Sequence, residues 1–418
     1  MSPLFACSIL AALSAAPAKP GPAAEPVIRV GLQIDAGAAT VSSDGQVRIW
    51  RAGSGLAGSA FGPGCAFRLV PAVPPPHDPS ESHPGLTLIA SSGDTLGTFE
   101  EELLFEPLTP HAPLEVEARP YRGELAVHAT REGGVTIVNA VRIDDYLRGV
   151  LPLEMGAGDA TPASALEAQA IAARSYSLFY LGRRAEQRCD LLASTEDQVY
   201  GGMAVETPAG TRAVLTTRGI VATHRGRPIR ANYCSTCGGM TEASDQAWRG
   251  ERFPYLRRVK DRDASGGALC SRSRLYRWKV RWARPQLEGI VLAHLPEEVP
   301  EARRVTLGRL RDLRIVERTS SGRVRTLEVR TEGGTFRVDG DRVRRVVRTP
   351  EDGLLYSTLW GKFRRTADDG GSIELEGGGY GHGVGMCQFG ALELARRGAS
   401  AEGILRHYYR GVVLARWW

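Results

Sequence analysis

Lysine is scarce in this sequence of 418 residues. Four of its 53 basic residues are lysines, at positions 19, 260, 279 and 362, and the remainder are arginines. So strong a preference is typical of a GC-rich genome and does not point to a function. The 53 basic residues exceed the 47 acidic ones by six, which gives a net charge of +6. That excess is modest for the length, so we expect no nucleic-acid partner.

Long apolar runs are also missing after the N-terminus. No stretch of about 18 apolar residues occurs there, so we expect no transmembrane span in the mature chain. Residues 1–18 are themselves apolar and end in Ala16, Pro17 and Ala18, the small-residue form of a signal-peptidase site, although no basic segment precedes them. We therefore predict an exported protein with a signal peptide over 1–18 and a Pro- and Ala-rich linker over 19–26. The alternative is an unstructured start.

Several short catalytic motifs do not occur. The sequence has no Gly-x-Ser-x-Gly segment and no His-Glu-x-x-His segment, which argues against the usual α/β-hydrolase and zinc-peptidase arrangements. A Gly-rich run at 377–385 holds six glycines in nine residues, but it lacks the order of a phosphate-binding loop. A nucleotide substrate is therefore not expected.

The length suggests two or three domains, or one domain with a large insertion. Short strand-like segments at 27–34, 47–50, 66–70, 86–90 and 114–118, separated by Pro and Gly turns, predict a β-rich N-terminal region over 27–120. Residues 121–418 mix helical and strand patterns. Within them we interpret the Arg-rich stretch at about 250–355 as an accessory insertion. The predicted fold class is α+β, with a mixed α/β core, a β-rich N-terminal region and an insertion lobe.

Within the core we expect a hairpin from residues 124–128 and 135–141, followed by a short helix that begins over 143–150 and ends in residues 151–155. The strongest helical pattern covers 162–184, where Leu166, Ala170 and Ala173 share one face. Further strands are expected at 213–223, 228–233, 305–307, 326–330 and 335–338. Two helices are expected to close the chain, at 387–397 and 401–409.

Glu154 is the first candidate for chemistry. It lies between Leu153 and Met155, at the end of the short helix and before a Gly-rich loop. A carboxyl group held among apolar side chains is partly desolvated, which raises its pKa toward the value that a general acid needs at neutral pH. The alternative is an ordinary solvated or helix-capping glutamate.

The Gly-rich run places His382 near its centre. Glycine lets the backbone approach a ligand or a second strand closely. We interpret the run either as part of a binding site that includes His382, or as a tight turn before a helix in which His382 is a structural hydrogen-bonding residue.

Seven cysteines are present, and six remain if residues 1–18 are removed. Cys234 and Cys237 form a C-x-x-C pair, and Cys270 follows. These three can belong to a zinc site or to a disulfide. A redox pair is less favoured, because no thioredoxin-like helix follows. Candidates for a fourth zinc ligand are Asp261, Asp263 and, through the fold, His382.

Polar and aromatic residues recur close to these motifs. Arg174, Ser175 and Tyr176 lie on the long helix, and Gln198 and Tyr200 follow it. Aromatic rings beside amides and hydroxyls suit carbohydrate faces, although most aromatic residues simply pack in a core.

Six segments, in this order, resemble the stage II sporulation protein D family, which is also called the amidase-enhancer family. They are residues 145–155 (DYLRGVLPLEM), 165–176 (ALEAQAIAARSY), 198–202 (QVYGG), 233–241 (YCSTCGGMT), 381–391 (GHGVGMCQFGA) and 404–409 (ILRHYY). The resemblance covers about 135–418, less clearly the insertion at 250–355.

The resemblance implies a protein of the periplasm or cell wall that acts on peptidoglycan. Family members are lytic transglycosylases, which cut glycan strands and prefer strands stripped of their stem peptides, or helpers of cell-wall amidases. The catalytic glutamate of the family lies in a Glu-Met motif, so the resemblance assigns that role to Glu154. A non-catalytic, peptidoglycan-binding enhancer of an amidase is the alternative. The residues predicted to bind substrate are Arg174, Ser175, Tyr176, Gln198, Tyr200, Ser235, His382 and Gln388.

Two departures from the family pattern concern cysteine. Cys387 stands where members commonly have serine, and Cys234 stands where members with a metal site often have histidine. A histidine-to-cysteine exchange keeps a zinc ligand. The resemblance therefore favours a structural zinc ion held by Cys234, Cys237 and Cys270, with a disulfide as the alternative. The chemistry of Glu154 itself requires no cofactor.

Overall fold

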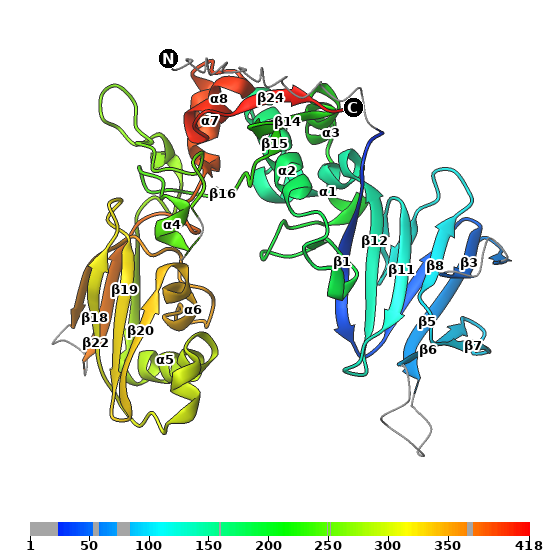
Figure 1. Ribbon diagram of the computed structural model, residues 1–418, viewed down its shortest axis with the longest axis horizontal. Coiled ribbons are helices and arrows are strands. Elements are labelled where there is room, and N and C mark those ends of the chain that lie inside the picture. Colours follow the sequence, from blue (N-terminus) through cyan, green and yellow to red (C-terminus); the bar gives the residue numbers. More distant parts are fainter. Residues whose placement is uncertain are drawn as a thin grey trace, which may run out of the picture.

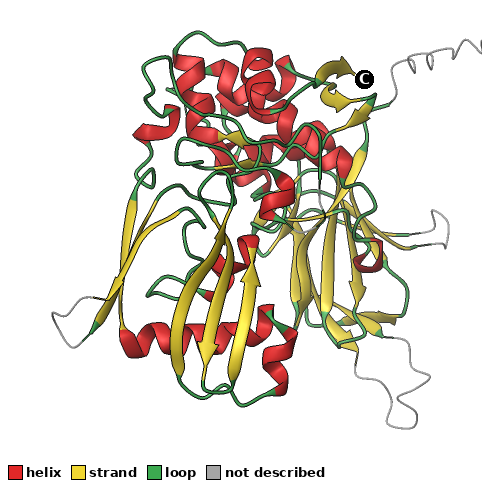
Figure 2. Cartoon of the chain, turned by 60° about the vertical axis from the view of Figure 1, so that its left-hand side comes forward, coloured by secondary structure: helices red, strands yellow, loops and turns green. Residues whose placement is uncertain are grey.

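The computed structural model describes residues 24–418 except 53–57, 73–83, 159, 249, 251 and 366–370. The predicted signal peptide and most of the predicted linker lie outside the described residues. Two β-rich parts flank a helical part, and most helices gather at one end of the molecule (Figures 1 and 2). The arrangement has separate sheets and helices, which confirms the predicted α+β class.

The N-terminal part consists of two sheets that share one hydrophobic core. Alternate residues of a strand point to the same face of its sheet. In the strand at 39–43, for example, Ala39, Val41 and Ser43 are buried and the residues between them are not. The seven-stranded sheet has the order β13 (Leu191–Leu192), β1 (Val27–Ala36), β12 (Val135–Arg142), β11 (Glu124–Ala129), β8 (Leu103–Pro107), β3 (Val47–Arg51) and β4 (Ser59–Phe61). The six-stranded sheet has the order β10 (Arg119–Tyr121), β9 (Leu114–Val116), β2 (Ala39–Ser43), β5 (Cys65–Ala72), β6 (Gly85–Ala90) and β7 (Thr95–Phe99).

The helical part is built around α2 (Ala163–Phe179), which is Ala-rich, contains no Gly or Pro and is buried on almost every side. It packs against α1 (Ile143–Met155), α3 (Pro208–Thr216), α7 (Gln388–Arg396) and α8 (Ala401–Tyr408). Two small sheets complete this part. One has the order β15 (Arg227–Pro228), β14 (Ile220–His224) and β24 (Val413–Arg416), and the other pairs β16 (Tyr233–Cys234) with β23 (Met386–Cys387). The short α4 (Ser244–Ala247) follows β16.

A second β-rich lobe lies between β16 and β23 in the chain and has a core of its own. Its sheets have the orders β17 (Trp278–Ala283), β22 (Ser372–Gly377), β21 (Trp360–Arg365) and β18 (Leu310–Arg318), β19 (Val324–Thr331), β20 (Gly334–Asp339). The helices α5 (Arg284–Glu298) and α6 (Val343–Val346) pack on them. The lobe differs in extent from the predicted insertion at about 250–355. Tyr255, Leu256 and Cys270 pack into the core of the helical part, whereas β22 completes the lobe by pairing with β17.

Several elements differ from the sequence expectations. The segment expected as a strand over 213–223 is divided between two elements. Its first residues, to Thr216, belong to α3, because Pro208 fits a first helical turn and the Thr207 side chain accepts a hydrogen bond from the Gly210 N–H. Its last residues form the strand β14, which begins at Ile220. Residues 305–307, which were expected as a strand, form none. The strand β18 and the helix α5 were not predicted from the sequence. The first helix, α1, ends at Met155, as expected. None of the described helices combines the length and hydropathy needed to cross a bilayer.

Candidate functional site

Glu154 lies in the last turn of α1. The helix ends because Gly156 takes a left-handed conformation with φ 62°, and its N–H donates to the Pro152 carbonyl over 2.9 Å. Leu151 and Met155 turn into the core. Glu154 itself is half-buried and faces a cleft.

The Glu154 carboxylate has two hydrogen-bond donors. The Val199 backbone N–H donates to Oε1 over 3.0 Å, and the Gln388 side-chain amide donates to Oε2 over 3.4 Å. Burial raises the pKa of Glu154, and these two hydrogen bonds offset the rise in part. The carboxyl group therefore keeps its proton to a higher pH than a solvated glutamate does.

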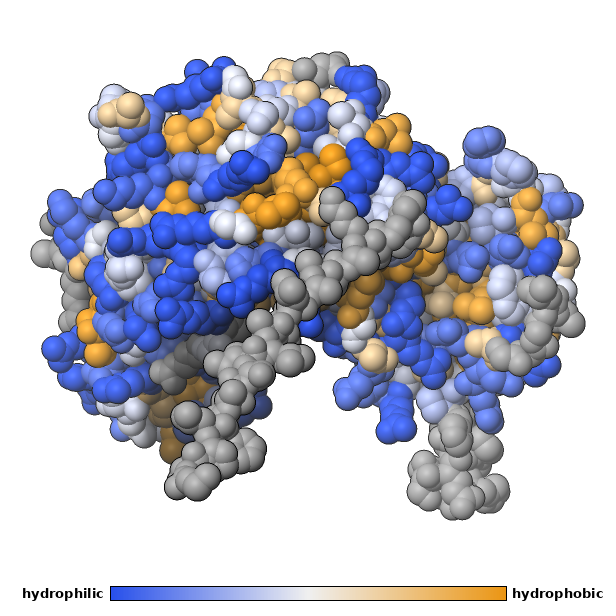
Figure 3. Space-filling view, turned by 45° about the horizontal axis from the view of Figure 1, so that its top comes forward, coloured by the Kyte–Doolittle hydropathy of each residue, from blue (hydrophilic) through white to orange (hydrophobic). Residues whose placement is uncertain are grey.

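The cleft has a volume of about 640 Å³, within the range of ligand-binding sites. One wall comes from the helical part and the other from the β17–β22 lobe. The space-filling outline is notched between the two β-rich parts, and the exposed face is mainly hydrophilic with scattered hydrophobic patches (Figure 3). The lining residues from the helical part include Glu154, Tyr176, Arg183, Asp197, Arg230, Trp248, His382 and Gln388, and those from the lobe are Asp341, Arg344, Arg345 and Leu354.

Five residues predicted for catalysis or substrate binding meet in this cleft: Glu154, Tyr176, Ser235, His382 and Gln388. They come together because β16 and β23 pair in parallel, with Tyr233 opposite Met386. The segments beyond these strands stay close, since the Phe389 N–H donates to the Ser235 carbonyl over 3.1 Å. The 233–241 and 381–391 motifs therefore form one surface beside Glu154.

His382 is neutral in this setting. Burial lowers its pKa to about 4, and its Nδ1 accepts a hydrogen bond from the Val384 N–H over 3.0 Å. The ring centroid lies 5.0 Å from that of Trp248. The remaining nitrogen, Nε2, then carries the ring proton, so His382 can donate a hydrogen bond to a ligand but is a poor general acid.

Glu154 differs from the other acidic residues of the cleft. Asp197 is paired with Arg183 at 2.6 Å and with Arg184 at 3.3 Å. The remaining two acids are also paired, Glu196 with Arg184 and Asp341 with Arg344. Among the described residues, Glu154 forms no ion pair. It is therefore the cleft carboxyl whose protonated form is least disfavoured by its surroundings.

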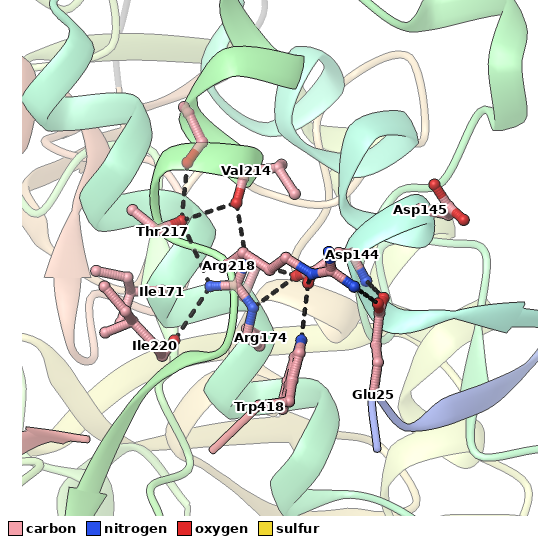
Figure 4. Close-up of polar contacts among 12 residues, drawn as sticks. Glu25, Asp144, Asp145, Ile171, Arg174, Val214, Thr217, Arg218, Ile220 and Trp418 are labelled. Carbon is pink, nitrogen blue, oxygen red and sulfur yellow. Dashed lines mark hydrogen bonds and ion pairs between the residues drawn. The ribbon is translucent and has the colours of Figure 1, made fainter. Parts of the chain in front are cut away.

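Four residues predicted to bind substrate lie outside the cleft, and the structure gives them internal partners instead. Arg174 donates from Nη2 to Asp144 Oδ1 over 2.6 Å, inside a network that includes Arg218, Trp418 and Glu25 (Figure 4). Ser175 donates to the Ile171 carbonyl. Gln198 is bonded to Tyr146, Ser177 and Tyr233, and Tyr200 donates to Asn139.

These positions follow from the geometry of the chain around each motif. Ser175 and Tyr176 are neighbours on α2, so their side chains point about 100° apart, and Tyr176 alone reaches the cleft. In the 198–202 segment the backbone N–H of Val199 meets Glu154, while the Gln198 side chain turns into the core. Sequence reasoning missed Val199, Trp248 and the lobe residues, and no local signal marked them.

The cysteines cluster differently from the predicted metal set. The ligand atoms of Cys237, Asp261, Cys270 and Cys387 lie within 4.8 Å of one another, and all four residues are buried. Cys234 is not part of this group and lines the cleft instead. Cys387 joins the group because β16 pairs with β23, Cys387 opposite Cys234, and its Sγ accepts a hydrogen bond from the Cys237 N–H over 3.2 Å.

Replacing Gly385 with alanine should destabilise the protein where the chain before β23 packs against the chain before β16. Gly385 has φ 75°, and a Cβ there would lie 1.9 Å from the Asn232 carbonyl oxygen. We expect a loss of about 2–5 kcal/mol in the free energy of unfolding, from backbone strain and overpacking together. Urea unfolding measures it.

Gly398 supplies the control for this prediction. Its φ is 87°, but a Cβ there meets no atom within 4 Å. Gly398→Ala should therefore cost about 1–2 kcal/mol, the conformational penalty alone. Equal losses in the two variants would contradict the close approach of the strands.

Comparisons with known proteins agree with the motifs. A sequence model described as Stage II sporulation protein matches residues 131–224, and one described as a domain of unknown function matches 266–385, a range that contains every strand of the lobe. An uncharacterized protein of Brachyspira hyodysenteriae is 28% identical over 318 residues, which cover 76% of this chain and 77% of the relative. Stage II sporulation protein D of Bacillus amyloliquefaciens is 28% identical over 290 residues, or 66% of this chain and 74% of the relative. The amidase enhancer of Bacillus subtilis is 28% identical over 291 residues, which cover 64% of this chain but 40% of that longer relative.

Proposed function

Because the chain belongs to the family of stage II sporulation protein D and the amidase enhancer, we propose that it is a lytic transglycosylase that cleaves peptidoglycan glycan strands with Glu154. The observation that carries the proposal is the state of the Glu154 carboxyl group. It is desolvated, lacks an ion-pair partner among the described residues, and opens into a cleft of about 640 Å³. These are the conditions that a general acid requires.

The reaction uses one carboxyl group twice. Protonated Glu154 donates its proton to the oxygen that joins N-acetylmuramic acid to N-acetylglucosamine, and the bond from C1 to that oxygen breaks. The C6 hydroxyl of the same muramic residue then attacks C1, and its proton returns to the Glu154 carboxylate. The product has a 1,6-anhydro ring and no water is consumed. Since the attacking group belongs to the substrate, its effective concentration is high and no second carboxylate is needed to activate water.

The neighbours of Glu154 support this cycle. The Val199 N–H and the Gln388 amide hold the two carboxylate oxygens in fixed positions, and they stabilise the ionised form that follows proton donation. His382, neutral and beside Trp248, can donate to a sugar hydroxyl or an acetamido carbonyl. Trp248, Tyr176 and Tyr380 offer aromatic edges and faces to the sugar rings.

We propose that the substrate is a strand stripped of its stem peptides. In such strands each muramic residue ends in a free lactyl carboxylate. Arg183, Arg230, Arg344 and Arg345 line the cleft, and arginine suits carboxylate recognition. We further propose that the chain is exported and acts in the periplasm or cell wall.

The rate of cleavage should fall as the pH rises through the pKa of Glu154, because only the protonated carboxyl group can donate to the leaving oxygen. Burial holds that pKa above the ordinary value of 4.5. The decline is therefore displaced to higher pH than a solvated glutamate would give. Initial rates on purified glycan, measured in buffers of constant ionic strength, give the profile.

The same pKa shift affects stability with a defined sign. The folded chain binds the proton more tightly than the unfolded chain, so the wild type should lose stability relative to Glu154→Gln as the pH rises through the folded-state pKa. The two proteins should differ least below the unfolded-state pKa, where Glu154 is neutral in both states. A difference in unfolding free energy that stays constant with pH would contradict the raised pKa.

A second candidate role is stimulation of a cell-wall amidase by a protein bound to peptidoglycan, which the match to a relative named amidase enhancer favours. The two roles differ in their dependence on Glu154. An enhancer would bind glycan without forming anhydro products, and its stimulation of an amidase would survive Glu154→Gln. Product analysis with and without an added amidase separates them.

A further inference from the structure

Three sulfur atoms and one carboxylate converge behind the cleft, at a place that the proposed chemistry does not use. They belong to Cys237, Cys270, Cys387 and Asp261, and each of these residues has 0% exposure. The Sγ atoms of Cys237 and Cys270 are 3.8 Å apart, and Cys237 Sγ lies 3.0 Å from Asp261 Oδ2. All four ligand atoms fall within 4.8 Å of one another.

These spacings fit the edges of a tetrahedron around zinc. With Zn–S bonds of about 2.3 Å and Zn–O bonds of about 2.1 Å, the ligand–ligand edges are about 3.8 Å between sulfurs and about 3.6 Å between sulfur and oxygen. The observed 3.8 Å between Cys237 and Cys270 equals the first edge. The 3.0 Å between Cys237 Sγ and Asp261 Oδ2 is shorter than the second edge, and the other ligand atoms lie within 4.8 Å of one another. Closing the tetrahedron therefore requires movements of up to about an ångström, within the reach of side-chain rotation.

We propose that Cys237, Cys270, Cys387 and Asp261 together bind one structural zinc ion. Three thiolates select a soft or borderline metal over magnesium or calcium. Four protein ligands in a fully buried position leave no place for a water or substrate, which is the character of a structural site and not of a catalytic one. The site is independent of the proposed role of Glu154.

The surroundings of the four ligands are those of a prepared metal site. The Tyr408 hydroxyl donates to Asp261 Oδ1 over 2.7 Å, which leaves Oδ2 directed at the sulfurs. The Gly239 N–H donates to Cys237 Sγ over 3.3 Å, and the Cys237 N–H donates to Cys387 Sγ over 3.2 Å. Such outer hydrogen bonds orient ligands and stabilise thiolates. A cation in the middle also balances the charge of a fully buried carboxylate, which is otherwise costly.

Zinc at this position ties together three segments that are distant in the sequence. Cys237 follows the Ser235 segment of the cleft, Cys270 lies in a short 3-10 helix (Leu269–Arg272), and Cys387 precedes Gln388, whose amide faces Glu154. The ion would hold the start of α7 against the loop after β16. It therefore positions one side of the cleft without touching the substrate.

Metal analysis of the purified full chain tests the proposal. We expect about one zinc per chain by mass-spectrometric metal analysis, and at least about a tenfold lower content in Cys270→Ser, Cys387→Ser and Asp261→Asn. Two matched controls, Cys234→Ser and Cys189→Ser, should keep the full content, because each removes a buried thiol that lies outside the cluster. Glu154→Gln should also keep it, so failure of the zinc proposal and failure of the proposed function are distinguishable.

A second measurement uses the wild type alone, and so tests the proposal even if the cluster variants do not fold. Wild-type protein is stripped with a chelator under reducing conditions and titrated with Cd²⁺, whose thiolate complexes absorb in the ultraviolet. We expect saturation at one equivalent and a higher melting temperature in the loaded form. The proposal is overturned if the stripped chain takes up no metal, if Cys234→Ser loses metal as the cluster variants do, or if non-reduced peptide mapping finds a Cys237–Cys270 disulfide.

Discussion

Glu154→Gln is expected to stop glycan-strand cleavage while leaving the fold intact. Glutamine has the size of glutamate and can still accept the Val199 N–H, but it has no proton to give to the glycosidic oxygen. General acid–base catalysis contributes about 10²–10⁴-fold to a rate, and in the proposed cycle Glu154 serves once as acid and once as base, so we expect a loss of about 10³-fold or more. Initial rates of soluble-product release from purified glycan strands measure this loss.

Glu196 offers the matched control for that experiment. It lines the same cleft, but its side chain is 63% exposed and paired with Arg184 at 3.2 Å. Glu196→Gln makes the same carboxyl-to-amide exchange without touching the proposed proton donor, and it should keep most of the activity. Wild-type rates in Glu154→Gln, with its circular dichroism spectrum and melting temperature unchanged, would remove Glu154 from the catalytic role.

Arg174→Met is expected to be the most destabilising single exchange among the charged residues of the helical part. Arg174 is fully buried on α2, and two of its nitrogens donate to Asp144 Oδ1 at 2.8 and 2.6 Å. Removing one partner leaves a buried carboxylate without its main cation, and such exchanges cost about 3–5 kcal/mol. Denaturant unfolding of wild type and variant gives the difference in free energy.

The control for Arg174 is an exposed pair on α8. Arg406 and Glu402 are 2.6 Å apart, but their side chains are 63% and 50% exposed. Arg406→Met should change stability by less than about 0.5 kcal/mol, because solvent screens the pair. If Arg174→Met cost no more than Arg406→Met, and instead weakened glycan binding, the internal role assigned to Arg174 would be wrong and the original expectation of substrate contact would return.

Local signals in the sequence predicted much of the fold. The alternating strands of the N-terminal region, the hairpin that forms β11 and β12, and the long Ala-rich helix all follow from periodicity. The prediction failed where a local pattern was ambiguous. The 213–223 segment is rich in Thr and Val, which favours a strand, but the Thr207 cap and Pro208 begin a helix there. The helix α5 buries Leu287, Val291 and Leu295 on one face, but Gly289 and Pro296 interrupt the helical pattern in its sequence.

The sequence predicted which motifs form the candidate site, but not which side chains of each motif point into the cleft. Glu154, His382 and Gln388 belong to motifs more than 200 residues apart, and family order was enough to group them. Which neighbour in a motif faces the cleft depends on the element that carries it, as Ser175 and Tyr176 show. The same limit applies to the cysteines: the C-x-x-C spacing favoured Cys234, whereas a parallel strand pair brings Cys387 to the cluster.

The lobe between β17 and β22 gives the cleft its second wall. Asp341, Arg344 and Arg345 come from the short helical segments after β20, and nothing in their sequence marked them as cleft residues. The sequence model of unknown function covers this lobe and ends at residue 385, inside the Gly-rich run. The lobe and the cleft-lining motifs of the helical part therefore share one cleft.

The most direct test of the account is the chemical identity of the ends that the protein creates. Purified peptide-free glycan strands are incubated with wild-type protein, and the fragments are analysed by mass spectrometry. The account predicts muramic ends that carry a 1,6-anhydro ring, lighter by one water than hydrolytic ends, and none of them with Glu154→Gln. Reducing muramic ends formed by the wild type would show hydrolysis and contradict the intramolecular attack. Intact strands, together with amidase stimulation that survives Glu154→Gln, would contradict catalysis altogether.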